Sequence, residues 1–319
     1  MKVEVFDLKL IKEDGKPYIG GDDLKGQITL QVRESVQITR LTLRLQGEVQ
    51  TAWIDKYSEI MYKSKEYVLN EYIDLTSELQ RHCTESMLFH EGKHVMNFCT
   101  TIPLDVISSL ERDNMGYVKY TCVAVLDIPE GGDSEFVAEC DFKVVSFLNL
   151  DAPYLRESAV DEERVHLIGY CCRKPKGFIR ARMEVTETGI LPGETVRLNV
   201  TFENTIKKRK RKKTPKCALI SLCQQLDFRA ESTVQRGYMG ERSVTMALKS
   251  QGACKSAPGK GPEDRQIDFD VPDGLPPTSV KANGLVTVSY FFRLDMEHFD
   301  VIVPVVIGSV KTIGSQIFH

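Results

Sequence analysis

Hydrophobic and polar residues alternate along most of this 319-residue chain. A period of two is the pattern of a β-strand with one buried face, whereas an amphipathic helix repeats every 3.6 residues. A helical turn is suggested only at 106–111. Many short strands with turn residues between them indicate an all-β fold of antiparallel, immunoglobulin-like sandwiches. The alternation predicts strands at positions 24–32, 41–49, 67–71, 94–102, 118–126, 142–146, 178–185, 196–202, 218–228, 267–271, 286–294 and 301–307.

The apolar phase slips by one residue near the N-terminus. Val3 and Val5 share one parity, whereas Phe6, Leu8 and Leu10 share the other. A slip of one residue turns the following side chains to the opposite face of a sheet, unless an extra residue bulges out of the strand. The sequence therefore predicts a β-bulge in an edge strand.

A polar segment at 151–164 interrupts the alternation and predicts a linker between an N-terminal domain at 1–150 and a C-terminal domain at 165–319. The halves resemble each other. Gly21-Asp22-Asp23-Leu24 parallels Gly193-Glu194-Thr195-Val196, Ser108-Ser109 parallels Thr278-Ser279, and Gly116-x-Val118-x-Tyr120 parallels Gly284-x-Val286-x-Val288. A repeat of about 170 residues is too long for a solenoid and fits two tandem copies of one sandwich domain.

The segment HEGKH gives His90, Glu91 and His94 the H-E-x-x-H spacing of a zinc hydrolase. Two histidines at that spacing bind one metal only on a helix, and Gly92 costs a helix about 1 kcal/mol relative to alanine. The residues from His94 onward alternate as in a strand. We therefore interpret the segment as a turn entering a strand, with the zinc hydrolase as a remote alternative.

Composition excludes several classes of protein. The chain is 42% hydrophobic and 27% charged, as in an ordinary soluble globular protein. It contains no apolar run long enough to span a membrane, and its N-terminus lacks the apolar core of a signal peptide, so we expect a cytoplasmic protein. The nine cysteines form no C-x-x-C pair and are expected to be reduced. No phosphate-binding glycine loop, nucleophile elbow or dinucleotide motif occurs, so neither an enzyme nor a cofactor is predicted.

The net charge of −3 conceals one uninterrupted basic run. Adjacent cations repel one another and stay solvated, so we expect an exposed loop between two strands. Such a loop attracts anionic phospholipid headgroups, at about 1 kcal/mol per residue, or phosphorylated receptor tails. A nuclear-localisation signal and a merely solubilising loop are the alternatives. Nucleic acid is not a predicted partner, because no aromatic residues interleave with the charges. The run comprises Lys207, Lys208, Arg209, Lys210, Arg211, Lys212 and Lys213.

Two further sites contain cysteine. Cys171 and Cys172 precede two basic residues, which fits either a lipidation site or the start of a strand. Cys254 lies in a polar stretch beside Lys255, whose charge would favour a thiolate, so Cys254 is a possible reactive thiol.

Taken together, these motifs resemble the arrestin family, and within it the α-arrestin or arrestin-domain-containing branch. In the second half the resemblance lies in Pro192-Gly193-Glu194, Phe202-Glu203-Asn204 and the segment 303–308. In the first half it lies in the segment Gly21–Leu30, a glycine-acidic turn leading into the second strand, and in an ordered set of positions, namely Gly92, His94, Phe98, Pro103, Ser108, Ser109, Gly116, Val118, Lys119 and Tyr120.

The resemblance implies a non-enzymatic adaptor that binds cytoplasmic parts of membrane receptors or transporters and directs their endocytosis, sorting or degradation. It also implies a cytoplasmic location at the plasma membrane or endosomes, and nuclear location stays open. Many α-arrestins recruit ubiquitin ligases through Pro-Pro-x-Tyr, which occurs nowhere in this sequence. A ligase link is therefore not expected. The sequence ends shortly after Gly308, as in a shorter member of the family or after trimming of a tail.

The resemblance also gives two weaker expectations. One branch of the family uses a cysteine in the region of Cys254 for a mixed disulfide with thioredoxin, which makes a redox-linked scaffold an alternative function. Phosphate-sensing arrestins place cations in the region of Lys9 and Lys12, although both also fit ordinary surface lysines.

Overall fold

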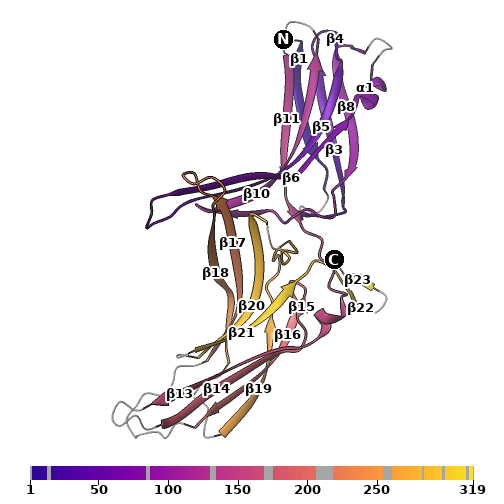
Figure 1. Cartoon of the computed structure of the whole chain (residues 1–319). Coiled ribbons are helices and arrows are strands. Elements are labelled where there is room, and N and C mark those ends of the chain that lie inside the picture. The colour runs from indigo at the N-terminus through magenta and orange to yellow at the C-terminus, as the bar shows by residue number, and fades with distance from the viewer. Residues whose placement is uncertain are drawn as a thin grey trace. The chain divides into compact units, whose positions relative to one another are not determined.

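A computed structural model of the chain describes residues 2–12, 16–83, 87–129, 134–168, 175–205, 218–253, 261–281, 284–296, 299–313 and 316–318. It consists of two compact units rich in β-strands (Figure 1). Unit 1 comprises Met1–Phe147 together with Phe228–Glu241, and unit 2 comprises Leu148–Asp227 and Arg242–His319. No helix in the described part of the chain is long and apolar enough to cross a membrane.

Unit 1 contains a three-stranded sheet in the order β1-β3-β8 and a larger sheet in the order β11-β10-β5-β6, with β9 paired to β10. β2 and β12 form a parallel pair and β4 and β7 an antiparallel pair. The elements are β1 (Val3–Leu10), β2 (Tyr18–Ile19), β3 (Asp23–Val32), β4 (Val36–Gln37), β5 (Arg40–Ile54), β6 (Met61–Asp74), α1 (Thr76–Gln80), β7 (Leu88–Phe89), β8 (Gly92–Thr101), β9 (Leu110–Arg112), β10 (Gly116–Ile128), β11 (Ser134–Phe142) and β12 (Val144–Val145).

Unit 2 repeats this plan with a four-stranded sheet in the order β13-β14-β16-β19 and a five-stranded sheet in the order β15-β21-β20-β17-β18. A 3-10 helix (Pro153–Arg156) precedes the first strand. The strands are β13 (Ala159–Ile168), β14 (Pro175–Val185), β15 (Gly189–Ile190), β16 (Thr195–Asn204), β17 (Leu219–Glu231), β18 (Met239–Gly252), β19 (Gly261–Asp270), β20 (Val286–Met296), β21 (Phe299–Ile307), β22 (Lys311–Ile313) and β23 (Gln316–Phe318).

The predicted alternation is what fills the two cores. Along β5, every second residue from Leu41 to Trp53 is buried, and all of these except Gly47 and Thr51 are apolar. The same alternation buries one face of β16 and of β20. The all-β prediction of two tandem sandwiches is confirmed, because each unit buries the apolar faces of antiparallel sheets against each other.

Each core contains a buried tyrosine whose hydroxyl donates to a backbone carbonyl 13 or 14 residues earlier in the chain. The Tyr120 hydroxyl donates to the Ile107 carbonyl at 2.7 Å, and the Tyr290 hydroxyl donates to the Pro276 carbonyl at 2.6 Å. Both side chains are 1% exposed. Tyr290, rather than Val288, is therefore the counterpart of Tyr120, which corrects the predicted alignment of the repeat.

The predicted bulge is present at the first strand. The register of β1 against β3 shifts between Val3 and Val5, and β1 is an edge strand of its sheet. Because the extra residue absorbs the slip, Val3 and Leu8 both reach the core despite their opposite parity.

The segment 151–164 differs from the predicted linker. Residues 153–156 form the 3-10 helix, and β13 begins at Ala159. β13 pairs with β14 from Ala159 to Ile168, so its backbone hydrogen bonds stabilise the strand although residues 161–164 are all charged. Residues 106–109 have no helical structure, and β9 begins at Leu110.

Candidate functional site

Each unit contains a sharp acidic turn directly after its first two-residue strand, β2 in unit 1 and β15 in unit 2. In unit 1, Gly21 has φ +97° and the Asp22 carboxylate accepts a hydrogen bond from the Ile19 N–H at 2.8 Å. In unit 2, Gly193 has φ +82° and the Glu194 carboxylate accepts from the Leu191 N–H at 2.8 Å. Glycine is favoured at a positive φ because it has no Cβ. The glycine–acid pair identified in the sequence therefore closes the same turn twice.

A lysine from outside the turn contacts each acidic turn. In unit 1, Lys12 Nζ lies 3.8 Å from an Asp22 oxygen and donates to the Pro17 carbonyl at 2.7 Å. In unit 2, Lys311 Nζ lies 3.5 Å from an oxygen of Glu194 and 3.1 Å from an oxygen of Glu187. The Lys311 side chain is only 12% exposed. The lysine of the unit 2 turn is thus more buried than that of unit 1, and it contacts a second carboxylate.

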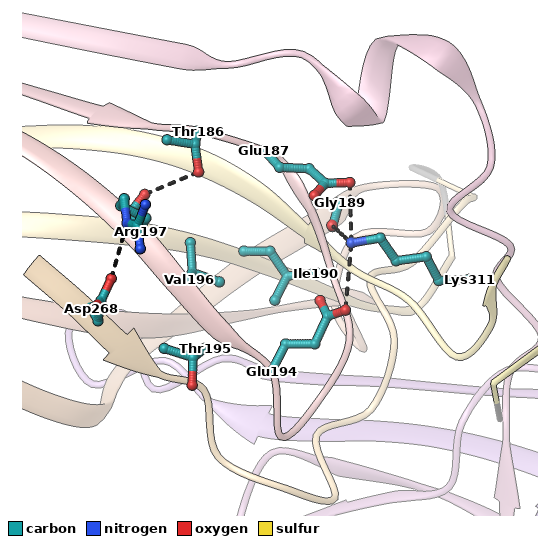
Figure 2. Close-up of a pocket in the computed structure, with 10 residues that line it drawn as sticks. All are labelled: Thr186, Glu187, Gly189, Ile190, Glu194, Thr195, Val196, Arg197, Asp268 and Lys311. Atoms are coloured by element: carbon teal, nitrogen blue, oxygen red, sulfur yellow. Dashed lines mark hydrogen bonds and ion pairs between the residues drawn. The ribbon is translucent and has the colours of Figure 1, made fainter. Parts of the chain in front are cut away.

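A pocket of about 440 Å³ opens at the unit 2 turn. Figure 2 shows the Lys311 ammonium pointing between the carboxylates of Glu187 and Glu194, with Ile190 and Val196 beside them. The lining residues are Thr186, Glu187, Gly189, Ile190, Glu194, Thr195, Val196, Arg197, Asp268 and Lys311.

The charges of this pocket are paired with one another. Lys311 is satisfied by two carboxylates and by the Gly189 carbonyl at 3.3 Å, and the Arg197 guanidinium lies 3.2 Å from Asp268. Charges that are paired in this way hold neighbouring strands together, and they leave no unpaired nucleophile or general acid among these residues. Among the described residues, no cluster of three or more His, Cys, Asp or Glu side chains is arranged to hold a metal ion.

Residues 309–312 extend this cluster by binding the start of unit 2. The Leu148 N–H donates to the Ser309 hydroxyl at 2.7 Å. The two Asp151 carboxylate oxygens accept from the Thr312 N–H at 2.9 Å and from the Thr312 hydroxyl at 2.6 Å. Together with Lys311, these contacts fix both ends of the unit 2 chain to its acidic turn, and we call residues 309–312 the strap.

The strap makes stability sensitive to acid. Hydrogen bonds from the hydroxyl and the N–H of Thr312 lower the pKa of Asp151 below its ordinary 3.8. A carboxylate whose pKa is lower in the folded state stabilises the fold above its unfolded pKa, and this stabilisation is lost as the pH falls through the folded pKa. Asp151→Asn should therefore lower the urea midpoint at pH 7 and have a shrinking effect below about pH 4. A difference from wild type that stays constant down to pH 2 would contradict this.

The predicted basic run and the predicted thiols lie outside the described residues. These are Lys207–Lys213 as one segment, Cys254, and the pair Cys171 and Cys172. The flanks of the basic run are described: β16 ends at Asn204 and β17 begins at Leu219. The run therefore connects two strands of unit 2, as the alternation predicted.

The two histidines of HEGKH make short-range contacts at the start of a strand. β8 begins at Gly92, whose φ of +137° confirms the predicted turn into a strand. His94 Nε2 lies 2.9 Å from the His90 carbonyl oxygen, and His90 Nδ1 lies 3.4 Å from the Ser35 hydroxyl. Because His94 is on a strand and bonded to the backbone of His90, the helical geometry of a zinc hydrolase is not formed.

Lys9 and Lys12 differ in their surroundings. Lys9 is 77% exposed and forms a surface ion pair with Asp7 at 3.4 Å. Lys12 also lies 4.0 Å from the centroid of the Tyr18 ring, a cation–π contact. Lys12 is thus bound within its own unit, whereas Lys9 is an ordinary surface lysine.

Lys311, Glu187 and the strap were not predicted from the sequence. Glu194 was noticed as part of a turn, but no short-range pattern connects it to Lys311. The one sequence signal for this site was a lysine directly after the buried Val310, because a half-buried ammonium group is stabilised by a carboxylate partner.

Comparison with known proteins identifies both halves of the chain. Residues 6–151 match the family model "Arrestin (or S-antigen), N-terminal domain", and residues 175–312 match the corresponding C-terminal domain. "Arrestin domain-containing protein 17" of Caenorhabditis elegans is 24% identical over 329 residues, covering 100% of this chain and 74% of that protein. "Arrestin domain-containing protein 15" of the same organism is 25% identical, covering 78% of this chain and 64% of that protein.

Human "Thioredoxin-interacting protein" is 22% identical over 223 residues, covering 69% of this chain and 54% of that protein. The chain therefore spans only part of the length of these relatives. The two domain matches occur in order and cover most of the sequence, on sandwiches that repeat the same acidic turn and buried tyrosine. The chain therefore belongs to the arrestin family of non-enzymatic adaptors, and its relatives are consistent with the α-arrestin, arrestin-domain-containing branch.

Proposed function

We propose that this protein is an adaptor that binds cytoplasmic parts of membrane receptors or transporters and directs their endocytosis, sorting or degradation. The observation that carries the proposal is the ordered match of both arrestin domains. The pocket of unit 2 supports it indirectly, because its charges pair internally and provide no catalytic constellation. The protein would act at the cytoplasmic surface of the plasma membrane or endosomes.

Proximity labelling in cells tests this proposal directly. The full chain fused to a labelling enzyme should enrich membrane receptors or transporters together with endocytic components, relative to the labelling enzyme alone. A fusion carrying Tyr290→Ala, which destabilises the core of unit 2, should lose the enrichment that depends on the folded surface. Enrichment of soluble cytoplasmic proteins without membrane cargo would contradict the proposed function.

The basic run at 207–213 would strengthen membrane contact. Cations near an anionic bilayer contribute about 1 kcal/mol each, and this attraction falls off within a Debye length. We expect binding to vesicles with anionic phospholipid that weakens steeply between low and physiological salt. Replacing all seven basic residues by glutamine should abolish this binding and leave the thermal unfolding midpoint unchanged. Binding that is independent of salt, or unchanged in the neutralised variant, would contradict this role.

A redox-linked or nuclear scaffold is the second candidate, and the similarity to a thioredoxin-interacting protein favours its redox form. Cys254 would then form a mixed disulfide with thioredoxin, which a Cys254→Ser variant would abolish. The nuclear form requires the basic run, and it predicts that the neutralised variant loses nuclear signal in imaged cells. Capture of thioredoxin that persists in Cys254→Ser would exclude that thiol as the point of contact.

A further inference from the structure

β18 is a long edge strand. It ends the five-stranded sheet of unit 2, and no described strand pairs with the side of β18 that faces away from β17 (Figure 1). Its residues from Arg242 onward belong to unit 2. An edge strand of 14 residues presents a row of backbone N–H and C=O groups that can pair with another chain.

The other long edge strands of unit 2 carry protection that β18 lacks. β19 contains Pro262 and five charged residues, and β13 has four charged residues in succession at 161–164. Proline and charge on an edge oppose pairing with another chain. β18 contains no proline, and its central segment 243–248 contains no charged residue.

The inward side chains of β18 are only partly covered. The Ser243 hydroxyl donates to an oxygen of Asp227, which lies on the outer face of β17, so the residues of opposite parity on β18 face the core. Leu222 and Leu226 on β17 are 0% and 1% exposed, whereas each of the inward residues of β18 is half-buried. A further strand beside β18 would cover them. These residues are Val244, Met246 and Leu248.

The pairing with β17 determines which backbone groups of β18 point to the open edge. The Ser232 N–H donates to the Tyr238 carbonyl at 2.9 Å, so Tyr238 directs its carbonyl toward β17. Successive residues of a strand direct their backbone groups to opposite sides, and the burial of β18 alternates without a break up to Leu248. Thr245 therefore directs both its N–H and its C=O away from β17.

We propose that β18 pairs with β18 of a second copy of this chain, antiparallel and around a two-fold axis close to Thr245. The two five-stranded sheets would then form one continuous sheet. Because the two strands are identical, the half-buried apolar residues of both copies lie on the same face and cover one another. The uncharged segments 243–248 lie opposite each other, so no like charges meet there. This pairing does not depend on the proposed adaptor function.

The test measures association and backbone protection on the full chain. A single pair of strand edges buries a small interface, so we expect weak association that depends on concentration. Sedimentation velocity should show a shift from monomer to dimer as the concentration rises. Hydrogen–deuterium exchange over the same concentration range should slow at the outward amides of 243–248, including that of Thr245.

Two substitutions of Thr245 test the edge directly. Thr245→Lys should weaken dimerisation about fivefold, because two ammonium groups would lie close together at the two-fold axis. Thr245→Pro removes an N–H that points away from β17, which an edge strand tolerates, so it should abolish the dimer and leave the thermal unfolding midpoint within a few degrees of wild type. Val160→Lys is the matched control. It adds the same charge to β13, where Val160 is 53% exposed, and should leave dimerisation within twofold of wild type.

Four results would overturn the pairing of β18 with itself. The first is a wild-type chain that stays monomeric at every concentration, and the second is a dimer in which the amides of 243–248 exchange as fast as in the monomer. The third is protection of these amides already in the monomer, which would mean that another segment of the same chain covers the edge. The fourth is an equal loss of dimer in Val160→Lys and Thr245→Lys, which would assign the effect to surface charge.

Discussion

Tyr290→Ala should lower the free energy of unfolding of unit 2 by about 3–5 kcal/mol, the range for removing a fully buried aromatic side chain. Tyr290 is 1% exposed, and its loss also leaves two polar groups without their partner. Its hydroxyl donates to the Pro276 carbonyl at 2.6 Å and accepts from the Gln224 side-chain amide at 2.8 Å. Burial raises the pKa of the Tyr290 hydroxyl far above its ordinary value, so it is the neutral hydroxyl that donates. Urea unfolding followed by circular dichroism measures the effect.

Tyr290→Phe separates the hydrogen bonds from the packing. The ring is retained, so the expected loss is about 1–3 kcal/mol, the cost of leaving buried polar groups unsatisfied. Tyr154→Ala is the control, because that side chain is 67% exposed and should change stability by less than about 0.5 kcal/mol. If Tyr290→Phe were as stable as the wild type, the hydroxyl would have no part in closing the sandwich.

Lys311→Met should destabilise unit 2 by about 2 kcal/mol. Removing one partner of a fully buried ion pair costs about 3–5 kcal/mol, and the expected value is lower here because the Glu187 and Glu194 side chains are 36% and 28% exposed and solvent screens their charges. Methionine keeps most of the apolar stem of lysine, so the loss reports on the ammonium. Thermal unfolding of Lys311→Met and of the wild type, at low and at high salt, measures this loss of stability.

A second substitution provides the control for this prediction. In Lys311→Met, the two carboxylates face each other without a cation, so adding Glu187→Gln should recover part of the lost stability. Lys249→Met breaks a pair whose side chains are 38% and 70% exposed and should have little effect. A double variant less stable than Lys311→Met alone would show that repulsion between the carboxylates is not the cause.

The sequence predicted the strands that bury one apolar face and missed two edge strands, β13 and β18, for a physical reason. β5 lies between two neighbours and buries alternate side chains, so its pattern is strong. β18 is an edge strand with no fully buried residue, and β13 is an edge strand with Glu162, Glu163 and Arg164 in succession. Backbone hydrogen bonds to one neighbouring strand stabilise such strands even where their side chains are polar. The alternation of apolar and polar residues therefore does not predict them.

The candidate site was only half predictable. The glycine–acid turns could be recognised because a positive φ restricts the residue type locally. The lysine that completes the unit 2 turn could not, since Lys311 and Glu194 are 117 positions apart and are brought together only by the finished sandwich. The repeat was misaligned at Tyr290 for a similar reason. Gly284 resembles Gly116 in sequence, but the buried hydroxyl and its carbonyl partner define the equivalent position.

The membership of Phe228–Glu241 in unit 1 has a consequence for synthesis of the protein. Within unit 1, the Thr233 N–H donates to the Met61 carbonyl at 3.0 Å, and the Tyr238 ring lies 6.5 Å from that of Tyr62, which stacks on Trp53. A ribosome releases Trp53 and Tyr62 long before it has made residue 238. During translation this aromatic surface stays without its Tyr238 contact while the first half of unit 2 emerges, and exposed apolar surface of this kind makes a nascent chain prone to aggregation.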